Sequence, residues 1–257
     1  MTSKIEEYYN KFNENKRLKS KHGQVEFYVT LLKLMEELTG MNKPKILDIG
    51  AGTGAYSIEL NKLGFDVVAV ELVKHNLEVL HTLNQKIEAY QGNALDLSRF
   101  SDNSFDVVLL LGPMYHLFTF EDKLKALLEA KRVVKNGGVI FVAYCMKDYA
   151  IITHAFKENH LKEDLTSHKL DESFNLHTTE EDLYSYDNLE TINTLKETSG
   201  LKRKRIFSPD GPTDYMRECV KNMDDETFEK YKSYVLSISE RQDLIGSGSH
   251  IVDILIK

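Results

Sequence analysis

The chain has 257 residues, of which 42% are apolar, and its formal net charge is −7. This length suits one large domain, and the apolar fraction suffices for a buried core. Because an acidic chain without a basic patch does not attract phosphate backbones, we expect no nucleic-acid partner. Two widely separated cysteines, Cys145 and Cys219, provide neither a disulfide framework nor a zinc-ligand spacing, so we expect no metal.

The N-terminal 23 residues are charged and lack the apolar core of a signal peptide. No apolar run in the chain approaches the length that a membrane span requires. We therefore expect a cytoplasmic protein without a membrane partner. No feature of the sequence indicates an oligomeric state.

Residues 1–42 are predicted to be helical, because apolar side chains between Val25 and Leu38 recur on one helical face. Gly40 and Pro44 end this segment. Apolar strands and helices then alternate, which indicates βαβ units and a parallel sheet buried on both faces. The predicted strands are 45–49, 66–70, 87–90, 105–111 and 139–144, and the predicted helices are 56–63, 74–83 and 121–134, with a tight turn at 136–138.

Residues 145–185 are polar and contain no predicted strand. Because this stretch is too long for an ordinary loop, we expect an inserted helical cap. A helix at 189–198, a strand at 202–207, a helix at about 215–241 and a last strand, HIVDILIK, complete the chain. The basic run at 202–205 lies on a predicted strand, where we expect a solvated sheet edge.

A glycine-rich turn follows the first predicted strand. It reads Asp48-Ile49-Gly50-Ala51-Gly52-Thr53-Gly54, and the next strand ends at Glu71. Glycines let a ligand approach the backbone closely, and the following helix directs its free N–H groups toward that ligand. A carboxylate at the end of the second strand is placed to reach ribose hydroxyls. Alone, this pattern predicts a nucleotide-type site and also fits the G-x-G-x-x-G/A dinucleotide fingerprint.

Four further motifs follow in order, and with them the segment from about Lys45 to Tyr144 resembles the class I S-adenosylmethionine (SAM)-dependent methyltransferases. The family's first motif is matched by Asp48, Gly50, Gly52 and Gly54, its ribose-binding acid by Glu71, its adenine-contact motif by Gly92-Asn93-Ala94, its fourth-strand motif by FDVVLLLGPMYHL, and its fifth by residues 130–139. The set in this order is far more specific than any one member.

The resemblance implies a Rossmann-like three-layer α/β sandwich with a mostly parallel seven-stranded sheet whose last strand is antiparallel. It implies one methyltransferase domain over residues 1–257, with a helical lead at about 1–43 and the cap at about 145–185. SAM is the implied cofactor and S-adenosylhomocysteine its product. The implied cofactor-binding residues are Tyr28, Asp48, Gly50, Ala51, Gly52, Thr53, Gly54, Glu71, Leu72, Asn93, Ala94, Leu111 and Gly112.

The contacts expected of Asn93 and of the lead helix have alternatives. Asn93 stands where the family often has Asp, although an amide oxygen can still accept a hydrogen bond from the adenine amino group. In the lead helix, Arg17 could pair with the SAM carboxylate and Tyr28 could face it, and the alternative is an ordinary amphipathic helix. We expect the lead helix and the cap to form the acceptor chamber.

Methyl transfer from a sulfonium is an in-line displacement, in which the protein mainly positions the nucleophile and excludes water. The catalytic candidates are Tyr115, which could orient a nucleophile, and His116, which could act as a base. The alternative is that both only line the pocket. Gly112 lacks a side-chain acceptor for an exocyclic amino group, which disfavours methylation of nucleic-acid bases.

We therefore expect methyl transfer to a small-molecule acceptor, and three alternatives stay open. An NAD(P)-dependent oxidoreductase shares the turn and the acid, but no tyrosine here precedes a lysine by four residues, as in the short-chain dehydrogenase dyad. A non-catalytic SAM-binding protein would keep the turn without the chemistry. A tRNA or rRNA methyltransferase is opposed by the acidic charge and by Gly112.

Overall fold

A seven-stranded sheet organises the computed structural model, which describes residues 4–9 and 20–257. The strands are β1 (Lys45–Ile49), β2 (Asp66–Glu71), β3 (Glu88–Gln91), β4 (Phe105–Leu110), β5 (Val134–Cys145), β6 (Lys202–Phe207) and β7 (His250–Ile256). They lie in the order β3-β2-β1-β4-β5-β7-β6, and β7 runs in the opposite direction to the other six strands. The predicted mostly parallel sheet with an antiparallel last strand is confirmed.

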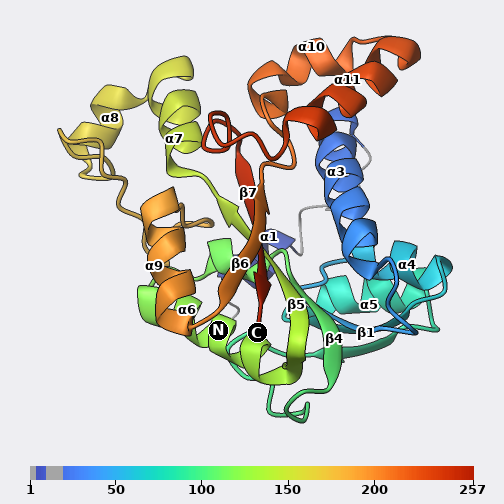
Figure 1. Ribbon diagram of the computed structural model, residues 1–257. Coiled ribbons are helices and arrows are strands. Elements are labelled where there is room, and N and C mark those ends of the chain that lie inside the picture. The colour runs from blue at the N-terminus through green and yellow to red at the C-terminus, as the bar shows by residue number, and fades with distance from the viewer. Residues whose placement is uncertain (1–3, 10–19) are drawn as a thin grey trace.

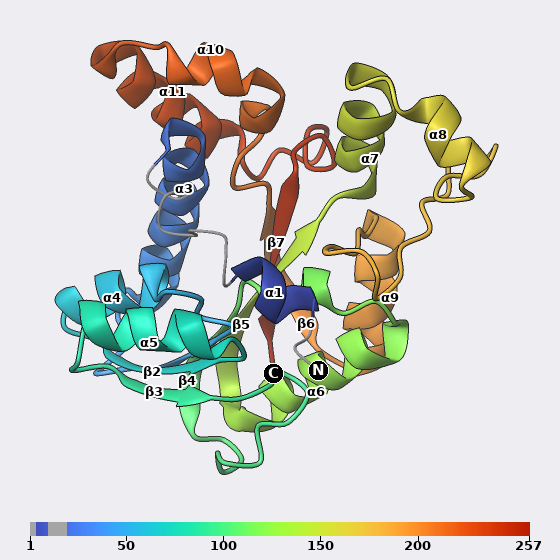
Figure 2. The same cartoon turned by 180° about the vertical axis from the view of Figure 1, so that it is seen from behind.

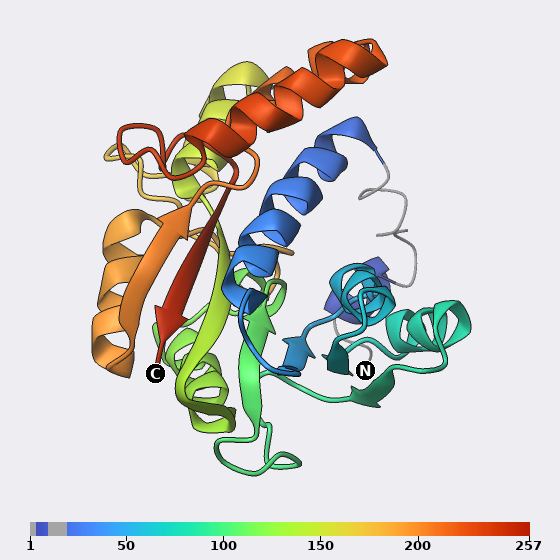
Figure 3. The same ribbon diagram turned by 45° about the vertical axis from the view of Figure 1, so that its right-hand side comes forward.

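Helices cover both faces of this sheet (Figures 1 and 3). On one face lie α3 (Lys21–Leu38), α4 (Ala55–Lys62), α5 (Lys74–Leu83) and α11 (Asp225–Ile238), and on the other α6 (Phe120–Val133) and α9 (Leu189–Ser199). Alternation along β1 feeds both cores, because Ile46 packs on the α3 side and Leu47 on the α6 side. No helix within the described residues is long and apolar enough to cross a membrane.

The short helix α1 (Lys4–Tyr9) lies over the carboxyl-end edge of the sheet (Figure 2). It contacts α5 on one side, and Lys4 lies 3.8 Å from Glu181 on the other. The predicted lead helix therefore consists of α1 and α3, and the residues between them lie outside the described part of the chain.

Most predicted boundaries lie within one residue of the observed ones, and two segments differ by more. The helix predicted over 215–241 is broken into η3 (Thr213–Met216), α10 (Arg217–Lys221) and α11, because the Asp224 side chain accepts from Thr227 N–H and starts a new helix. The turn predicted at 136–138 lies within β5, where Gly137 has φ +76° and the pairing with β4 shifts register.

The expected cap is helical only in its first half. It contains α7 (Lys147–Ala150), the π-helix η2 (Ile151–Lys157) and α8 (Leu161–Thr166), and most of the remainder up to residue 188 is irregular. Its two ends lie side by side, since Asp187 N–H donates to Cys145 O and Lys147 N–H donates to Asp187 O, both at 2.9 Å. The Lys123 ammonium on α6 lies 2.5 Å from the Asp187 carboxylate and fixes this junction.

Three of the four basic residues of β6 form ion pairs. Arg203 makes two bonds of 2.7 Å to the buried carboxylate of Asp253. Lys204 and Arg205 both bind Glu37 on α3. The expected sheet edge is confirmed, and Lys202 and Lys204 are exposed on it. The run is not wholly solvated, because acidic side chains of β7 and α3 lie within reach of Arg203, Lys204 and Arg205.

The Lys123–Asp187 pair yields a stability prediction. The two side chains are 5% and 3% exposed, so Lys123→Met leaves a buried carboxylate without its cation. We expect a loss of about 3–5 kcal/mol in the free energy of unfolding, measured by urea denaturation. As a control, Arg241→Met removes the exposed Arg241–Asp243 pair and should cost less than about 1 kcal/mol. Equal losses in the two variants would contradict the role given to the buried pair.

Candidate functional site

A cavity of about 530 Å³ opens at the carboxyl ends of the parallel strands. One end is lined by the glycine turn after β1 and by Glu71 at the end of β2. The other end reaches His250, the first residue of β7. Because β7 runs antiparallel to β5 and pairs His250 with Cys145, its beginning lies at the same edge as the ends of the other strands. The sheet topology thus places both ends in one cavity.

The three glycines of the turn have distinct roles. Gly50, Gly52 and Gly54 all have positive φ, between +57° and +87°, which glycine adopts without penalty. A Cβ on Gly50 would lie 2.7 Å from the Pro113 ring, and one on Gly54 would lie 2.8 Å from Leu80, so these two glycines are needed for packing. A Cβ on Gly52 would meet nothing within 4 Å. Gly52 therefore exposes its backbone to the cavity.

Glu71 joins the second strand to the glycine turn. One carboxylate oxygen accepts from Gly52 N–H at 2.7 Å, and the other accepts from Val73 N–H at 2.8 Å. The side chain is buried, and burial raises the pKa of Glu71 even though these backbone N–H groups favour its charged form. A carboxylate has about four lone-pair sites, so Glu71 keeps acceptor capacity toward a ligand.

Asp48 lies beneath the turn on β1. Asp48 is 2% exposed, and its carboxylate accepts a hydrogen bond from the Ser57 hydroxyl at 2.6 Å. Burial raises the pKa of Asp48 to about 6, the Ser57 bond opposes this shift, and the charge of Glu71 adds to it. Two carboxyl groups of this kind beside an open glycine backbone suit the hydroxyl and ammonium groups of an adenosyl amino acid.

Most of the predicted cofactor residues line the cavity: Asp48, Gly50, Ala51, Gly52, Thr53, Glu71, Leu72, Asn93, Ala94, Leu111 and Gly112. Gly54 does not line it and instead precedes α4 in a left-handed conformation. The Asn93 side-chain oxygen accepts from Leu95 N–H at 3.0 Å, which fixes the orientation of the amide. The residues at this end fit an adenosyl ligand.

Tyr28 does not line the cavity. Its ring lies 4.9 Å from the Lys232 ammonium on α11, so it faces the neighbouring helix instead of the ligand. From the same helix, Glu26 and Thr30 line the cavity. The predicted role of Arg17 falls on a residue outside the described part of the chain.

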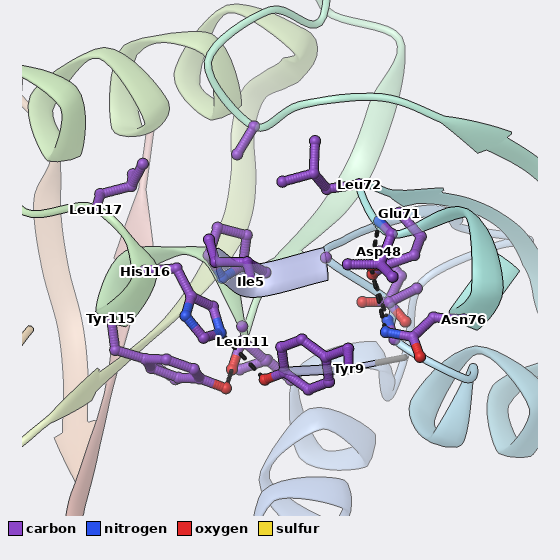
Figure 4. Close-up of a pocket in the computed structure, with 18 of the residues that line it drawn as sticks. Ile5, Tyr9, Asp48, Glu71, Leu72, Asn76, Leu111, Tyr115, His116 and Leu117 are labelled. Carbon is purple, nitrogen blue, oxygen red and sulfur yellow. Dashed lines mark hydrogen bonds between the residues drawn. The ribbon is translucent and has the colours of Figure 1, made fainter. Parts of the chain in front are cut away.

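Tyr115 and His116 lie in η1 (Pro113–His116), just after β4, and both line the cavity. His116 Nδ1 is 2.9 Å from Leu183 O, so it carries the hydrogen, and Nε2 accepts from the Tyr9 hydroxyl at 3.1 Å. Figure 4 shows Tyr115 and His116 on one side of the cavity and Asp48 and Glu71 on the other, with Ile5 between the two sides. Burial lowers the pKa of His116 to about 4, so its ring is neutral at neutral pH.

Several cavity residues escaped the sequence-based prediction: Tyr9, Glu26, Thr30, Pro209 and His250. Of the expected cap, only Glu180, Glu181 and Asp182 line this cavity. Residues of α7, η2 and α8 line a separate cavity of about 240 Å³ instead. One available signal was missed. An antiparallel last strand must begin at the carboxyl edge, which marks His250 as a candidate.

Two groups of the described side chains come close enough to hold a metal ion in principle: His154, Glu158 and His160, and Asp210, Asp214 and His250. The first group is mostly exposed. In the second, His250 Nδ1 is 2.6 Å from Asp210, and neighbouring negative charges outweigh the effect of burial and raise the pKa of His250 well above its usual value. The side chains of the second group are held together by hydrogen bonds, directly and through the Ser249 hydroxyl.

Residues 47–142 match the family model for a methyltransferase domain. A glycine/sarcosine N-methyltransferase of Aphanothece halophytica is 31% identical over 121 residues, which is 45% of this chain and 45% of that protein. A demethylmenaquinone methyltransferase of Renibacterium salmoninarum is 37% identical over 99 residues, which is 38% of this chain and 40% of that protein. The chain spans less than half the length of these curated relatives.

Solved structures with the same fold cover almost the whole chain. A SAM-dependent methyltransferase of Methanosarcina mazei has a TM-score of 0.57 at 18% identity, covering 88% of this chain and 96% of that one. A Thermotoga maritima structure, described as a SAM-dependent methyltransferase and possible histamine N-methyltransferase, also has a TM-score of 0.57, at 17% identity, covering 98% and 97%. At such identities the likeness shows the fold.

The raised pKa of Asp48 predicts how stability depends on pH. Because its pKa is about 6 in the folded chain and near 3.8 ordinarily, the folded state binds more protons between these values, and stability falls as pH rises through them. Asp48→Asn removes this loss. As pH rises from 4 to 7, the free energy of unfolding of the variant should therefore increase by up to about 3 kcal/mol relative to that of the parent, measured by urea denaturation.

The exposed Asp66, at the start of β2, provides the matched control. Asp66→Asn, measured in the same way, reports what the loss of an exposed carboxylate does to the pH dependence of unfolding. If Asp48→Asn shows the same pH dependence as the parent protein, Asp48 does not ionise in the folded chain as described.

Proposed function

Because the chain contains a class I SAM-dependent methyltransferase domain, we propose that it transfers a methyl group from SAM to a small-molecule acceptor. The observation that carries this proposal is the single cavity that runs from Glu71 to His250. When bound, SAM supplies an electrophilic methyl group on an excellent leaving group. The task of this chain is then to hold both reactants in line and to exclude water.

The cofactor lies at the Glu71 end of the cavity in this proposal. The remaining acceptor sites of Glu71 bind the ribose hydroxyls, and its bonds to Gly52 and Val73 hold the carboxylate in place before the ligand arrives. Gly52 allows close approach to the backbone, and Leu72 and Asn93 flank the adenine. The other predicted cofactor residues, apart from Tyr28 and Gly54, line the same cavity.

The acceptor lies at the other end, near Tyr9, Tyr115 and His116. Both nitrogens of His116 are bonded within the protein, and its low pKa makes it a weak base. We therefore assign His116 to positioning Tyr9, in place of the general-base role considered from the sequence. Tyr115 donates to Leu111 O at 3.2 Å and forms a wall of the acceptor end.

The cavity volume supports a small acceptor. About 530 Å³ is within the range of about 300–1,000 Å³ typical of small-molecule sites, and an adenosyl ligand fills much of it. The relatives named for glycine/sarcosine and demethylmenaquinone methylation suggest the acceptors to test first. An oxidoreductase has no support among these relatives.

The direct test uses SAM with a labelled methyl group. The purified protein is incubated with sarcosine, glycine, histamine and a catechol as separate acceptors, and labelled product and S-adenosylhomocysteine are quantified. The proposal expects both products to appear in equal amounts with at least one acceptor. Tight SAM binding without turnover on a broad acceptor panel would identify a non-catalytic SAM-binding protein instead.

Glu71 provides a quantitative prediction for cofactor binding. Glu71→Ala removes a buried charge-assisted acceptor, so SAM binding should weaken by about 1.5–3 kcal/mol, measured by calorimetric titration. The control is Glu78→Ala, because Glu78 is 63% exposed on α5 and does not line the cavity. Thermal unfolding of each variant shows whether it remains folded. An unchanged SAM affinity in folded Glu71→Ala would remove Glu71 from the ribose.

A further inference from the structure

His250 is the residue at the acceptor end whose bonding suits proton transfer. Its Nδ1 lies 2.6 Å from Asp210 Oδ2, and its backbone N–H also points at Asp210. Its Nε2 makes no hydrogen bond to any residue in the described ranges, and the side chain, 20% exposed, lines the cavity. One imidazole nitrogen is thus held by a buried carboxylate, while the other has no partner among the described residues on a ring that lines the cavity, which is the arrangement of a general base and its orienting acid.

Asp210 is itself held rigidly. It is 2% exposed, and its carboxylate lies 2.5 Å from the Ser249 hydroxyl, which also lies 2.6 Å from Asp214. Asp214 in turn pairs with Arg217 at 2.9 Å. This chain of contacts joins the segment after β6 to the start of β7. The orientation of the His250 ring is therefore set by the fold before any ligand binds.

The charged side chains that line the cavity are mostly negative. Glu26, Asp122, Glu180, Glu181 and Asp182 line the cavity, whereas Lys4 is the lining lysine and lies 3.8 Å from Glu181. Such a lining attracts a cation and repels an anionic acceptor. An amine in water is mostly a cation, and it must lose a proton before its nitrogen can attack a methyl group.

From these two observations we infer that the methyl acceptor is a small amine and that His250, oriented by Asp210, removes its proton. This inference rests on the proposed methyl transfer. The ammonium proton moves to His250 Nε2, the freed nitrogen pair forms the N–C bond, and the C–S bond breaks with its electron pair going to sulfur. The proton leaves the imidazolium for solvent after the product departs.

The charged and titratable groups around His250 come from every neighbouring element: Glu26 of α3, Tyr115 of η1, Cys145 of β5, Tyr149 of α7, Tyr186 before α9, Asp210 after β6 and Asp214 of η3. Burial alone would lower the pKa of His250, but Cys145, Glu26 and Asp210 outweigh it and raise the pKa. Turnover should therefore rise with pH through a value above the usual 6.5 of histidine.

The test combines three variants with readouts that do not require turnover. His250→Gln removes the base, Asp210→Asn keeps the shape but removes the charge, and His81→Gln alters an exposed histidine of α5 as the control. NMR titration of the His250 ring, in the presence of S-adenosylhomocysteine, reports its pKa in the parent and in Asp210→Asn. Calorimetry reports SAM affinity, and sarcosine binding in buffers of different ionisation enthalpy reports proton release.

We expect the His250 pKa to lie above 6.5 in the parent and to fall in Asp210→Asn, with the ascending limb of kcat/KM moving to lower pH by the same amount. His250→Gln should lower kcat by about 10²–10³-fold while SAM affinity stays within about twofold. In a buffer below the His250 pKa, sarcosine binding should release about one proton in the parent, because His250 must lose its own proton before it can accept one from the ammonium group. His81→Gln should match the parent throughout.

Three outcomes would overturn the inference: a His250 pKa at or below 6.5 in the parent, full turnover in folded His250→Gln, or methylation of the catechol in preference to every amine. The NMR titration of the parent protein tests the inference even if the variants do not fold, because it measures the His250 pKa directly. Failure of the proposed function is distinct, because it appears as absent SAM binding or absent turnover in the parent itself.

Discussion

The buried carboxylate of Glu71 is the constraint on which the site depends. It accepts from Gly52 N–H on one side and Val73 N–H on the other, so one side chain fixes the glycine turn against the end of β2. Burial makes its charge costly, and the backbone donors offset part of that cost. A ligand hydroxyl at this position completes the hydrogen bonding of a carboxylate that is already in place, so little reorganisation accompanies binding.

The antiparallel direction of β7 supplies the other half of the cavity. A seventh strand parallel to β5 would place His250 at the opposite edge of the sheet, whereas the observed pairing sets it beside Cys145. The segment after β6 then brings Asp210 against the imidazole. Residues separated by about forty positions in sequence thus form one unit, and its geometry follows from strand order and direction.

The parts of this structure that depend on local patterns could be predicted from the sequence. The glycine turn, Glu71 and the parallel strands follow from apolar strands that alternate with helices, glycines at fixed spacing and an acid at a strand end, and the antiparallel last strand was implied by the family resemblance. Tyr9 and Glu26 could not be found in this way, because their place in the cavity depends on how distant elements pack, whereas the direction of the last strand could have indicated His250. Tyr28 was misplaced for a related reason, since its helix turns that residue toward Lys232 on α11.

The central claim, that this cavity binds an adenosyl amino acid for methyl transfer, is tested most directly by calorimetric titration of the purified chain. SAM, S-adenosylhomocysteine and NADH are titrated separately under the same conditions. The account predicts saturable binding of both adenosyl ligands, with a stoichiometry of about one per chain, and no binding of NADH. Binding of NADH without binding of either adenosyl ligand would contradict it and leave only the Rossmann-like fold.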